Sequence, residues 1–233
     1  MQKHITPRAS LISEYTFIAY FFIVSFFPFD ADIIKLLCLL TFIGCWVTKM
    51  LSEKKIRFVK TSLTIPILSF FLCSLIASLH SVRIRYSLGT IESDYLEYFT
   101  IFFCMVNTIQ GQEQIRRIVK AMLITCGLVC AYGLYGYYTG IAIRDERLVA
   151  TFEYHSRIAK YISLFLPIAV CLFFHYKNVL TRLYLVILTI VCSFSLILTM
   201  NRTSWVAVLV AMFFIGFAAQ KKLLLCIFVG VCA

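Results

Sequence analysis

Two short stretches of this sequence concentrate residues that could do chemistry. The first is RDERLVATFEYHSR, from Arg144 to Arg157, with three arginines, one histidine and three carboxylates. The second is Asn201-Arg202-Thr203, further along the chain. A guanidinium group is a planar fork of donors that matches the oxygens of a phosphate group. The two stretches therefore predict a site that binds an anionic substrate through Arg144, Arg147, Arg157, His155 and Arg202.

A plainer interpretation of the same arginines stays open. Asp145, Glu146 and Glu153 are possible ion-pair partners, so the first stretch could be an ordinary salt-bridged loop. Arginines at the ends of apolar segments also extend toward lipid headgroups without any substrate. The sequence alone does not decide between these interpretations.

The elements that position these residues are apolar. The chain has 233 residues, of which 61% are hydrophobic and 14% charged, and its mean hydropathy is +0.91. Soluble domains carry about 25% charged residues. The charges separate apolar runs that have the length of transmembrane helices, about 20 residues. In lipid such a run pairs its own backbone groups by folding as a helix.

The sequence thus predicts an all-α, polytopic membrane helix bundle, a single transmembrane domain over residues 1–233. It has about eight complete spans and a partial ninth at 223–233. The eight spans are expected at 12–28, 33–51, 63–79, 95–109, 118–138, 158–175, 183–200 and 204–219.

The charges predict how the chain is oriented. One set of alternate loops (1–14, 49–60, 110–120, 175–182 and 220–222) holds fourteen of the 22 basic residues and three of the eleven acidic ones. The other set holds eight of each, so the whole net charge of +11 lies on one side. By the positive-inside rule that side is cytoplasmic, as is the N-terminus. The excess of basic residues therefore reflects the orientation of the chain in the membrane and does not indicate nucleic-acid binding.

The two sets also differ in the kind of basic residue. Nine of the eleven lysines fall on the cytoplasmic side, whereas six of the eight basic residues on the other side are arginine. This bias favours an arginine-lined site at the outer surface of the membrane.

Cysteine and glycine carry less information. All ten cysteines fall inside expected spans and none forms a C-x-x-C pair, so the sequence supports no disulfide framework, no metal site and no cofactor. Gly127, Gly133, Gly136 and Gly140 line one helix and are typical of close helix packing.

Both arginine stretches resemble a known family. The run from Arg147 to Tyr161, RLVATFEYHSRIAKY, resembles the outer loop and following helix of the O-antigen ligase and polymerase family of bacterial inner-membrane proteins. The run from Leu198 to Trp205, LTMNRTSW, resembles that family's arginine turn between two helices. Residues 144–220 carry these motifs, and the resemblance in helix pattern covers roughly 60–220. Ala150 stands where the family often has glycine, and Asn201 where serine or threonine usually precedes the arginine.

The resemblance implies metal-independent transfer of a saccharide at the periplasmic face. The donor is a glycan linked to undecaprenyl pyrophosphate, and the acceptor is a lipid A-core sugar or another glycan unit. Arg147 and Arg202 match the family's motif positions and are expected to act catalytically on the pyrophosphate, while Arg144, His155 and Arg157 are expected to bind substrate. Membrane lipid is the remaining expected partner.

Family members carry a large periplasmic loop that bears a histidine general base, and no such loop follows the second stretch here. We therefore expect an incomplete ligase. Restored surface glycan in a ligase-deficient strain would contradict that expectation. Two alternatives remain open at this point, a multi-span transporter or flippase and a non-catalytic membrane subunit.

Overall fold

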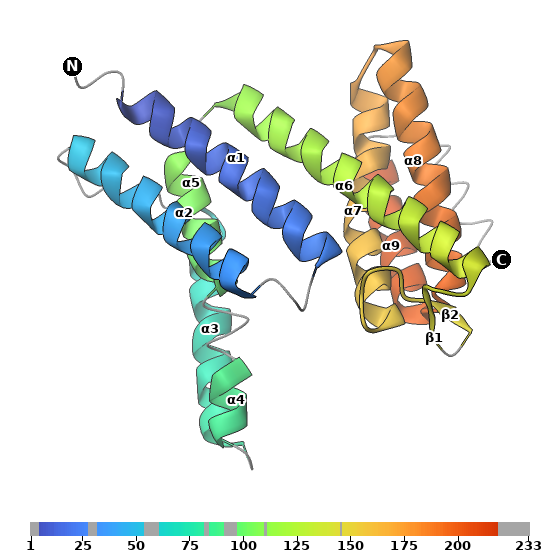
Figure 1. The fold of residues 1–233 in the computed structure, drawn as a ribbon, viewed down its shortest axis with the longest axis horizontal. Helices are drawn as coiled ribbons and strands as arrows, with labels where there is room; N and C mark the ends of the chain where they lie inside the picture. The colour runs from blue at the N-terminus through green and yellow to red at the C-terminus, as the bar shows by residue number, and fades with distance from the viewer. Residues whose placement is uncertain are drawn as a thin grey trace. The chain divides into compact units, whose positions relative to one another are not determined.

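A computed structural model of the chain describes residues 5–27, 32–53, 61–81, 84–90, 97–109, 111–144 and 146–218 (Figure 1). Within these residues the chain is almost entirely helical. The helices are α1 (Ile5–Phe26), α2 (Asp32–Glu53), α3 (Thr64–Leu79), α4 (Ile84–Thr90), α5 (Glu97–Thr108), α6 (Gln112–Thr139), α7 (His155–His175), α8 (Val179–Leu198) and α9 (Arg202–Ala218). The two strands are β1 (Ile143–Arg144) and β2 (Arg147–Leu148).

Three of these helices are long and apolar enough to cross a membrane: α6, α7 and α8. The sequence predicted eight complete spans, and the described residues do not support that number. At a rise of about 1.5 Å per residue, helix α5 with 12 residues and α3 with 16 fall short of about 30 Å of hydrocarbon. The other shorter apolar stretches are Leu11–Phe26, Leu36–Leu51 and Arg202–Phe217. The predicted partial span 223–233 lies outside the described residues.

Two elements were not predicted. Helix α4 lies between the expected third and fourth spans, and the β1–β2 hairpin precedes α7. Each is too short to leave a periodic pattern in the sequence, since α4 has seven residues and each strand has two.

The chain divides into two compact units. The first comprises 1–21 and 31–118, and the second comprises 22–30 and 119–233. In the first unit α2 packs against α5 and α3 against α4. The Phe42 ring on α2 is fully buried against the rings of Phe17 and Tyr20 on α1. The sequence predicted a single transmembrane domain, and the division into two units does not test that prediction.

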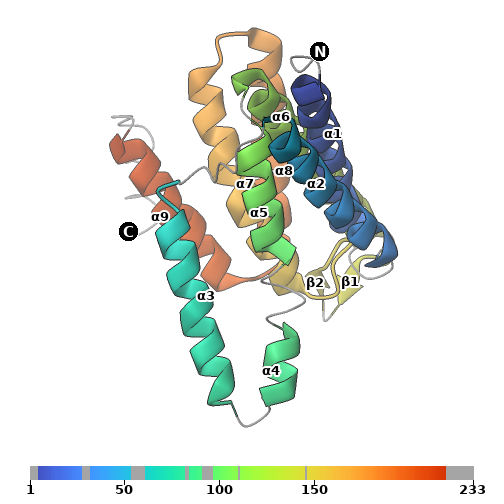
Figure 2. The same cartoon turned by 90° about the vertical axis from the view of Figure 1, so that its left-hand side faces the viewer.

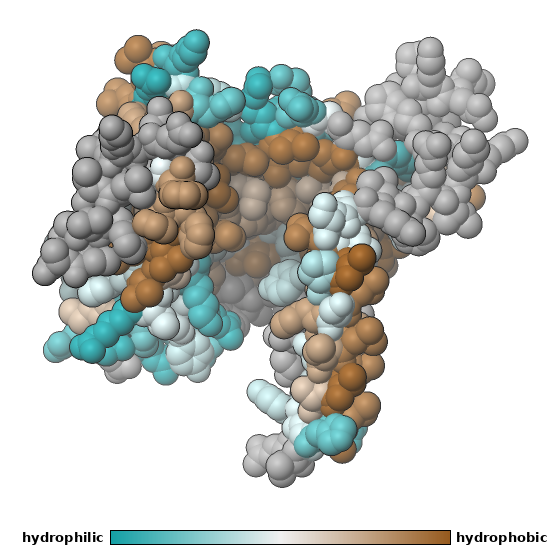
Figure 3. All heavy atoms as spheres, turned by 180° about the vertical axis from the view of Figure 1, so that it is seen from behind, coloured by the Kyte–Doolittle hydropathy of each residue, from teal (hydrophilic) through white to brown (hydrophobic). Residues whose placement is uncertain are grey.

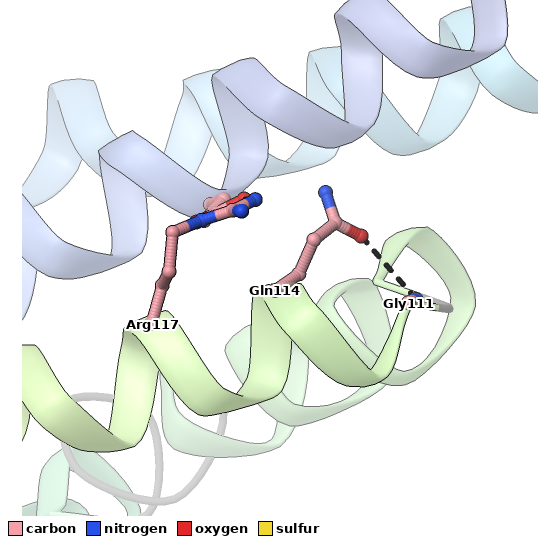
Figure 4. A network of polar contacts seen from close by, with 4 residues as sticks. Gly111, Gln114 and Arg117 are labelled. Carbon is pink, nitrogen blue, oxygen red and sulfur yellow. Dashed lines mark hydrogen bonds and ion pairs between the residues drawn. The ribbon is translucent and has the colours of Figure 1, made fainter.

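A buried ion pair joins α1 to the start of α6 in the first unit. Glu14 is fully buried, and its two carboxylate oxygens accept hydrogen bonds of 2.5 and 2.8 Å from the Nε and Nη2 of Arg117. Arg117 and Gln114 extend from the same side of α6, and Gln114 Oε1 accepts a hydrogen bond from the Gly111 amide (Figure 4). The charge count treated Glu14 as a loop residue. It lies instead inside a helix, where a buried carboxylate requires the bidentate partner that Arg117 supplies.

The second unit is built on an antiparallel pair of helices. Helices α7 and α8 are joined by only Tyr176–Asn178 and pack along their length, and α9 packs against α7. Asn178 caps α8 by accepting the Leu180 amide at 3.0 Å. The buried face of α7 repeats every three or four residues, as helical periodicity requires: Ile158, Ala159, Ile162, Phe165, Leu166 and Ala169.

The outer surface of this second unit is apolar between two polar ends. Large side chains such as Leu164, Ile190 and Phe214 are more than half exposed. On the left of Figure 3, hydrophilic residues gather at both ends of the unit and hydrophobic residues fill the band between them. A band of this kind suits contact with lipid, in agreement with the predicted membrane location.

Candidate anion site

The β1–β2 hairpin sets two arginines directly opposite each other. The strands pair in an antiparallel register in which Ile143 faces Leu148 and Arg144 faces Arg147. The turn between the strands contains Glu146 in a left-handed conformation, with φ of 61°, as tight hairpin turns commonly require. The Cβ atoms of directly opposite residues on an antiparallel strand pair lie about 5 Å apart. The hairpin therefore holds two positive charges on one small platform.

The guanidinium group of Arg147 is held by His155. Its Nη1 donates to His155 Nε2 at 3.1 Å, and both residues are partly exposed. Because arginine can only donate, the imidazole Nε2 is the acceptor in this contact. His155 begins α7, so the rigid end of that helix fixes the position of Arg147.

Arg144 and Arg157 share one aromatic neighbour. The Arg144 guanidinium lies 5.1 Å from the centre of the Tyr154 ring, and that of Arg157 lies 5.7 Å from it. Arg144 Nη1 also donates to the backbone carbonyl of Glu153 at 3.2 Å. Contacts of these kinds orient a guanidinium group over the face of an aromatic ring.

The hairpin is anchored to α6 and to the end of α1. Leu148 and Ala142 are buried, and the Val149 amide donates to the Ala142 carbonyl at 3.0 Å. The Thr151 hydroxyl donates to the Ser25 carbonyl at 2.7 Å, and Ser25 Oγ lies 3.2 Å from the hydroxyl of Tyr161. Ser25 could not be recognised from the sequence, because its role depends on a contact across more than one hundred residues.

Two glycines of α6 make room for the hairpin. A Cβ at Gly136 would lie 2.5 Å from Ala142 Cβ, and one at Gly133 would lie 2.8 Å from Ala150 Cβ. The sequence predicted that these glycines serve helix packing, whereas both are packed against the hairpin segment. Gly127 does serve helix packing, since a Cβ there would lie 3.0 Å from Leu188 on α8.

Ala150 has an unfavourable backbone conformation. Its φ is 50°, in the left-handed region that favours glycine. Alanine occupies this position at a conformational cost of about 1–2 kcal/mol.

Asn201 caps the helix that carries Arg202. Asn201 precedes α9, and its Oδ1 accepts from the Ser204 amide at 3.3 Å and from the Thr203 hydroxyl at 2.8 Å. It is the N-cap of the helix, a role for which asparagine, serine and threonine are all suited. Met200 completes the tight turn with φ of 51°, and Trp205 Nε1 donates back to the Leu196 carbonyl at 3.1 Å.

Arg202 is the first residue of α9 and is exposed. A helix N-terminus carries partial positive charge, so a cation in its first turn is unfavourable unless an anion is near. The start of α7, the end of α8 and the start of α9 come to the same end of the second unit, beside the hairpin (Figure 2). We call this the arginine end, defined by Arg144, Arg147, Arg157 and Arg202.

Comparison with protein-family models, curated proteins and solved structures finds no match for this chain. The site therefore stands on its own geometry.

Of the five predicted site residues, four lie close together. Arg144, Arg147, His155 and Arg157 surround the hairpin and the first turn of α7. Arg202 shares the same end of the unit, but the described residues include no side-chain contact between it and Arg147. Glu146 and Glu153 are exposed, and neither forms an ion pair with Arg144, Arg147 or Arg202 within the described part of the chain. Asp145, the third possible partner, lies outside it.

Proposed function

We propose that this chain is a bacterial inner-membrane protein of the O-antigen ligase type. It acts on a saccharide carried by undecaprenyl pyrophosphate, which is transferred to a lipid A-core sugar or to another glycan. The charge distribution supports a cytoplasmic N-terminus and a periplasmic arginine end. The apolar band of the second unit supports a donor that arrives with its lipid tail in the membrane.

The observation that carries the proposal is the pairing of Arg144 with Arg147 across the hairpin. Like charges directly opposite on paired strands are destabilising. The described carboxylates do not neutralise either arginine, and Arg202 adds a third cation at a helix start where an anion is favoured. An anionic ligand that binds these groups relieves the repulsion, and a pyrophosphate carries the negative charge for it.

The chemistry follows from the leaving group. When a saccharide leaves undecaprenyl pyrophosphate, negative charge develops on the diphosphate oxygens. Preorganised cations at a poorly solvated surface stabilise that charge more in the transition state than in the ground state. Arg147 and Arg202 contact the diphosphate, while Arg144 and Arg157 add positive potential. His155 orients Arg147, since its Nε2 lone pair is occupied by that contact.

Direct binding tests the proposal. The purified chain in lipid nanodiscs is titrated with undecaprenyl pyrophosphate and, separately, with undecaprenol. The diphosphate is expected to bind and the alcohol is not. Arg147→Lys and Arg202→Lys are each expected to weaken binding about tenfold, because lysine cannot reproduce a forked contact and a charged hydrogen bond contributes about 1.5–3 kcal/mol.

Arg182→Lys is the matched control. Arg182 lies near the start of α8, at the opposite end of the second unit, where its Nε donates to the Tyr176 carbonyl at 2.6 Å. Its replacement is expected to leave binding unchanged. Equal affinity for the diphosphate and the alcohol, or equal effects of all three substitutions, would refute the proposal and favour a transporter or a non-catalytic membrane subunit.

A further inference from the structure

Three cysteine thiols meet in the interior of the second unit, and none of them belongs to the arginine end. Cys126 and Cys130 are four residues apart on α6 and so share a helix face, and Cys192 comes from α8. The Sγ of Cys192 lies 3.8 Å from that of Cys126 and 3.8 Å from that of Cys130. All three sulfurs lie within 4.8 Å of one another, and no residue of the three is more than 1% exposed.

A local approach of α6 to α8 at Gly127 accompanies this meeting. Gly127 follows Cys126, and a Cβ at that position would lie 3.0 Å from Leu188 Cδ1 on α8. The missing side chain lets the two helices approach closely at the level of the thiols. The sequence suggested that these cysteines are small apolar packing residues, which would require only that each one is buried. Here they also face one another.

A fourth polar group lies at the same place. Ser195 follows Cys192 by one turn of α8, is fully buried and lies beside the Cys130 thiol. Its Oγ has no hydrogen-bond partner of good geometry within the described residues. The three thiols and this hydroxyl make the spot more polar than a purely apolar helix contact.

We propose that Cys126, Cys130 and Cys192 bind one soft metal ion of the class of Cu(I). A metal held at about 2.3 Å from each of three sulfurs sets those sulfurs about 3.8–4.0 Å apart. The two sulfur distances of 3.8 Å match this spacing. They are far longer than the bond of about 2.05 Å in a disulfide.

The donor set selects the kind of metal. Thiolate sulfur favours soft ions, and the cluster found among the described residues consists of cysteines, without the carboxylate oxygens that suit Mg²⁺ or Ca²⁺. A structural zinc site is closed by four strong ligands, whereas three sulfurs meet here. Each thiol that becomes a ligand releases its proton, so binding weakens as the solution becomes more acidic.

Copper retention by the whole chain tests this inference independently of the proposed function. The reduced, detergent-purified protein is loaded with Cu(I) and challenged with a graded Cu(I) chelator. Bound copper per chain and sulfur-to-copper ultraviolet absorption are then measured. We expect one Cu(I) per chain. Cys126→Ala, Cys130→Ala and Cys192→Ala are each expected to lower the copper affinity more than about 100-fold, because removing a metal ligand costs at least as much affinity as removing a residue that hydrogen-bonds to a ligand.

Cys73→Ala and Cys171→Ala are the matched controls, since both thiols are exposed on other parts of the described chain. They are expected to retain copper as the unchanged protein does. Cys192→Ser keeps the size of the side chain but supplies a poor ligand for a soft ion, and it is expected to retain the helical circular dichroism of the unchanged chain while losing copper. Absence of bound copper in the unchanged chain, or equal retention by the three cluster variants and the two controls, would overturn the inference.

Discussion

The Nη1 of Arg147 donates to the Nε2 of His155 at 3.1 Å, and this contact couples the hairpin to the first residue of α7. It joins two residues that the sequence singled out separately, one as a diphosphate ligand and the other as a substrate-binding group. In the structure the histidine accepts a hydrogen bond from the arginine, so His155 positions the Arg147 side chain.

Removing the histidine tests this positioning role. His155→Ala is expected to weaken undecaprenyl pyrophosphate binding about fivefold, because a typical hydrogen bond contributes about 1 kcal/mol. His155→Gln, whose side-chain oxygen can accept from Arg147, is expected to recover part of the loss. The nanodisc titration measures both. An unchanged affinity in His155→Ala would show that Arg147 needs no partner.

The glycines beneath the hairpin make a second prediction. Gly136→Ala is expected to destabilise the protein by about 1–3 kcal/mol, because the added Cβ would meet Ala142 Cβ at 2.5 Å and overpack the contact. Thermal unfolding in detergent measures this loss. Gly44→Ala is the control, since nothing lies within 4 Å of a Cβ at that helical position. It is expected to be neutral or stabilising by up to about 1 kcal/mol.

Gly133 and Ala150 are predicted to be coupled. Gly133→Ala brings two Cβ atoms to 2.8 Å, and Ala150→Gly removes one of them while relieving the left-handed φ of 50°. The double variant is therefore expected to be more stable than the sum of the single effects by about 1 kcal/mol. A double-mutant cycle of unfolding free energies measures the coupling, and strictly additive values would contradict the contact.

The helix cap before Arg202 gives a fourth prediction. Asn201→Ala removes the acceptor for the Ser204 amide and is expected to cost about 1 kcal/mol of stability. Asn201→Ser keeps a capping oxygen and is expected to stay within a few tenths of a kcal/mol of the unchanged chain. Thermal unfolding compares the two variants. A larger loss in the serine variant would show that Asn201 serves something other than the cap.

The ion pair of the first unit gives a fifth prediction. Arg117→Ala leaves the fully buried Glu14 without its bidentate partner, so a clear loss of stability is expected. Arg116→Ala is the matched control on the same helix, because its pair with Glu113 is exposed on both sides and such pairs contribute about 0–1 kcal/mol. Unfolding by heat or denaturant compares the two, and equal losses would contradict the burial of Glu14.

The sequence was most reliable where the signal is local. The expected spans at 118–138, 158–175 and 183–200 correspond to α6, α7 and α8, because hydropathy along one segment decides whether it can lie in lipid. The arginine stretches were also recognisable, since residue type and spacing are written in the chain itself.

Only the tertiary structure decided how those residues are paired. The opposition of Arg144 and Arg147 depends on a hairpin register set by a two-residue turn, and the position of Thr151 depends on Ser25, which is remote in sequence. The meeting of Cys126, Cys130 and Cys192 depends on which faces of α6 and α8 pack together at Gly127. Composition and periodicity indicate which segments, and which faces of them, are exposed to water, to lipid or to the protein interior. Contacts between segments arise from backbone geometry and close packing, which no single stretch of the chain contains.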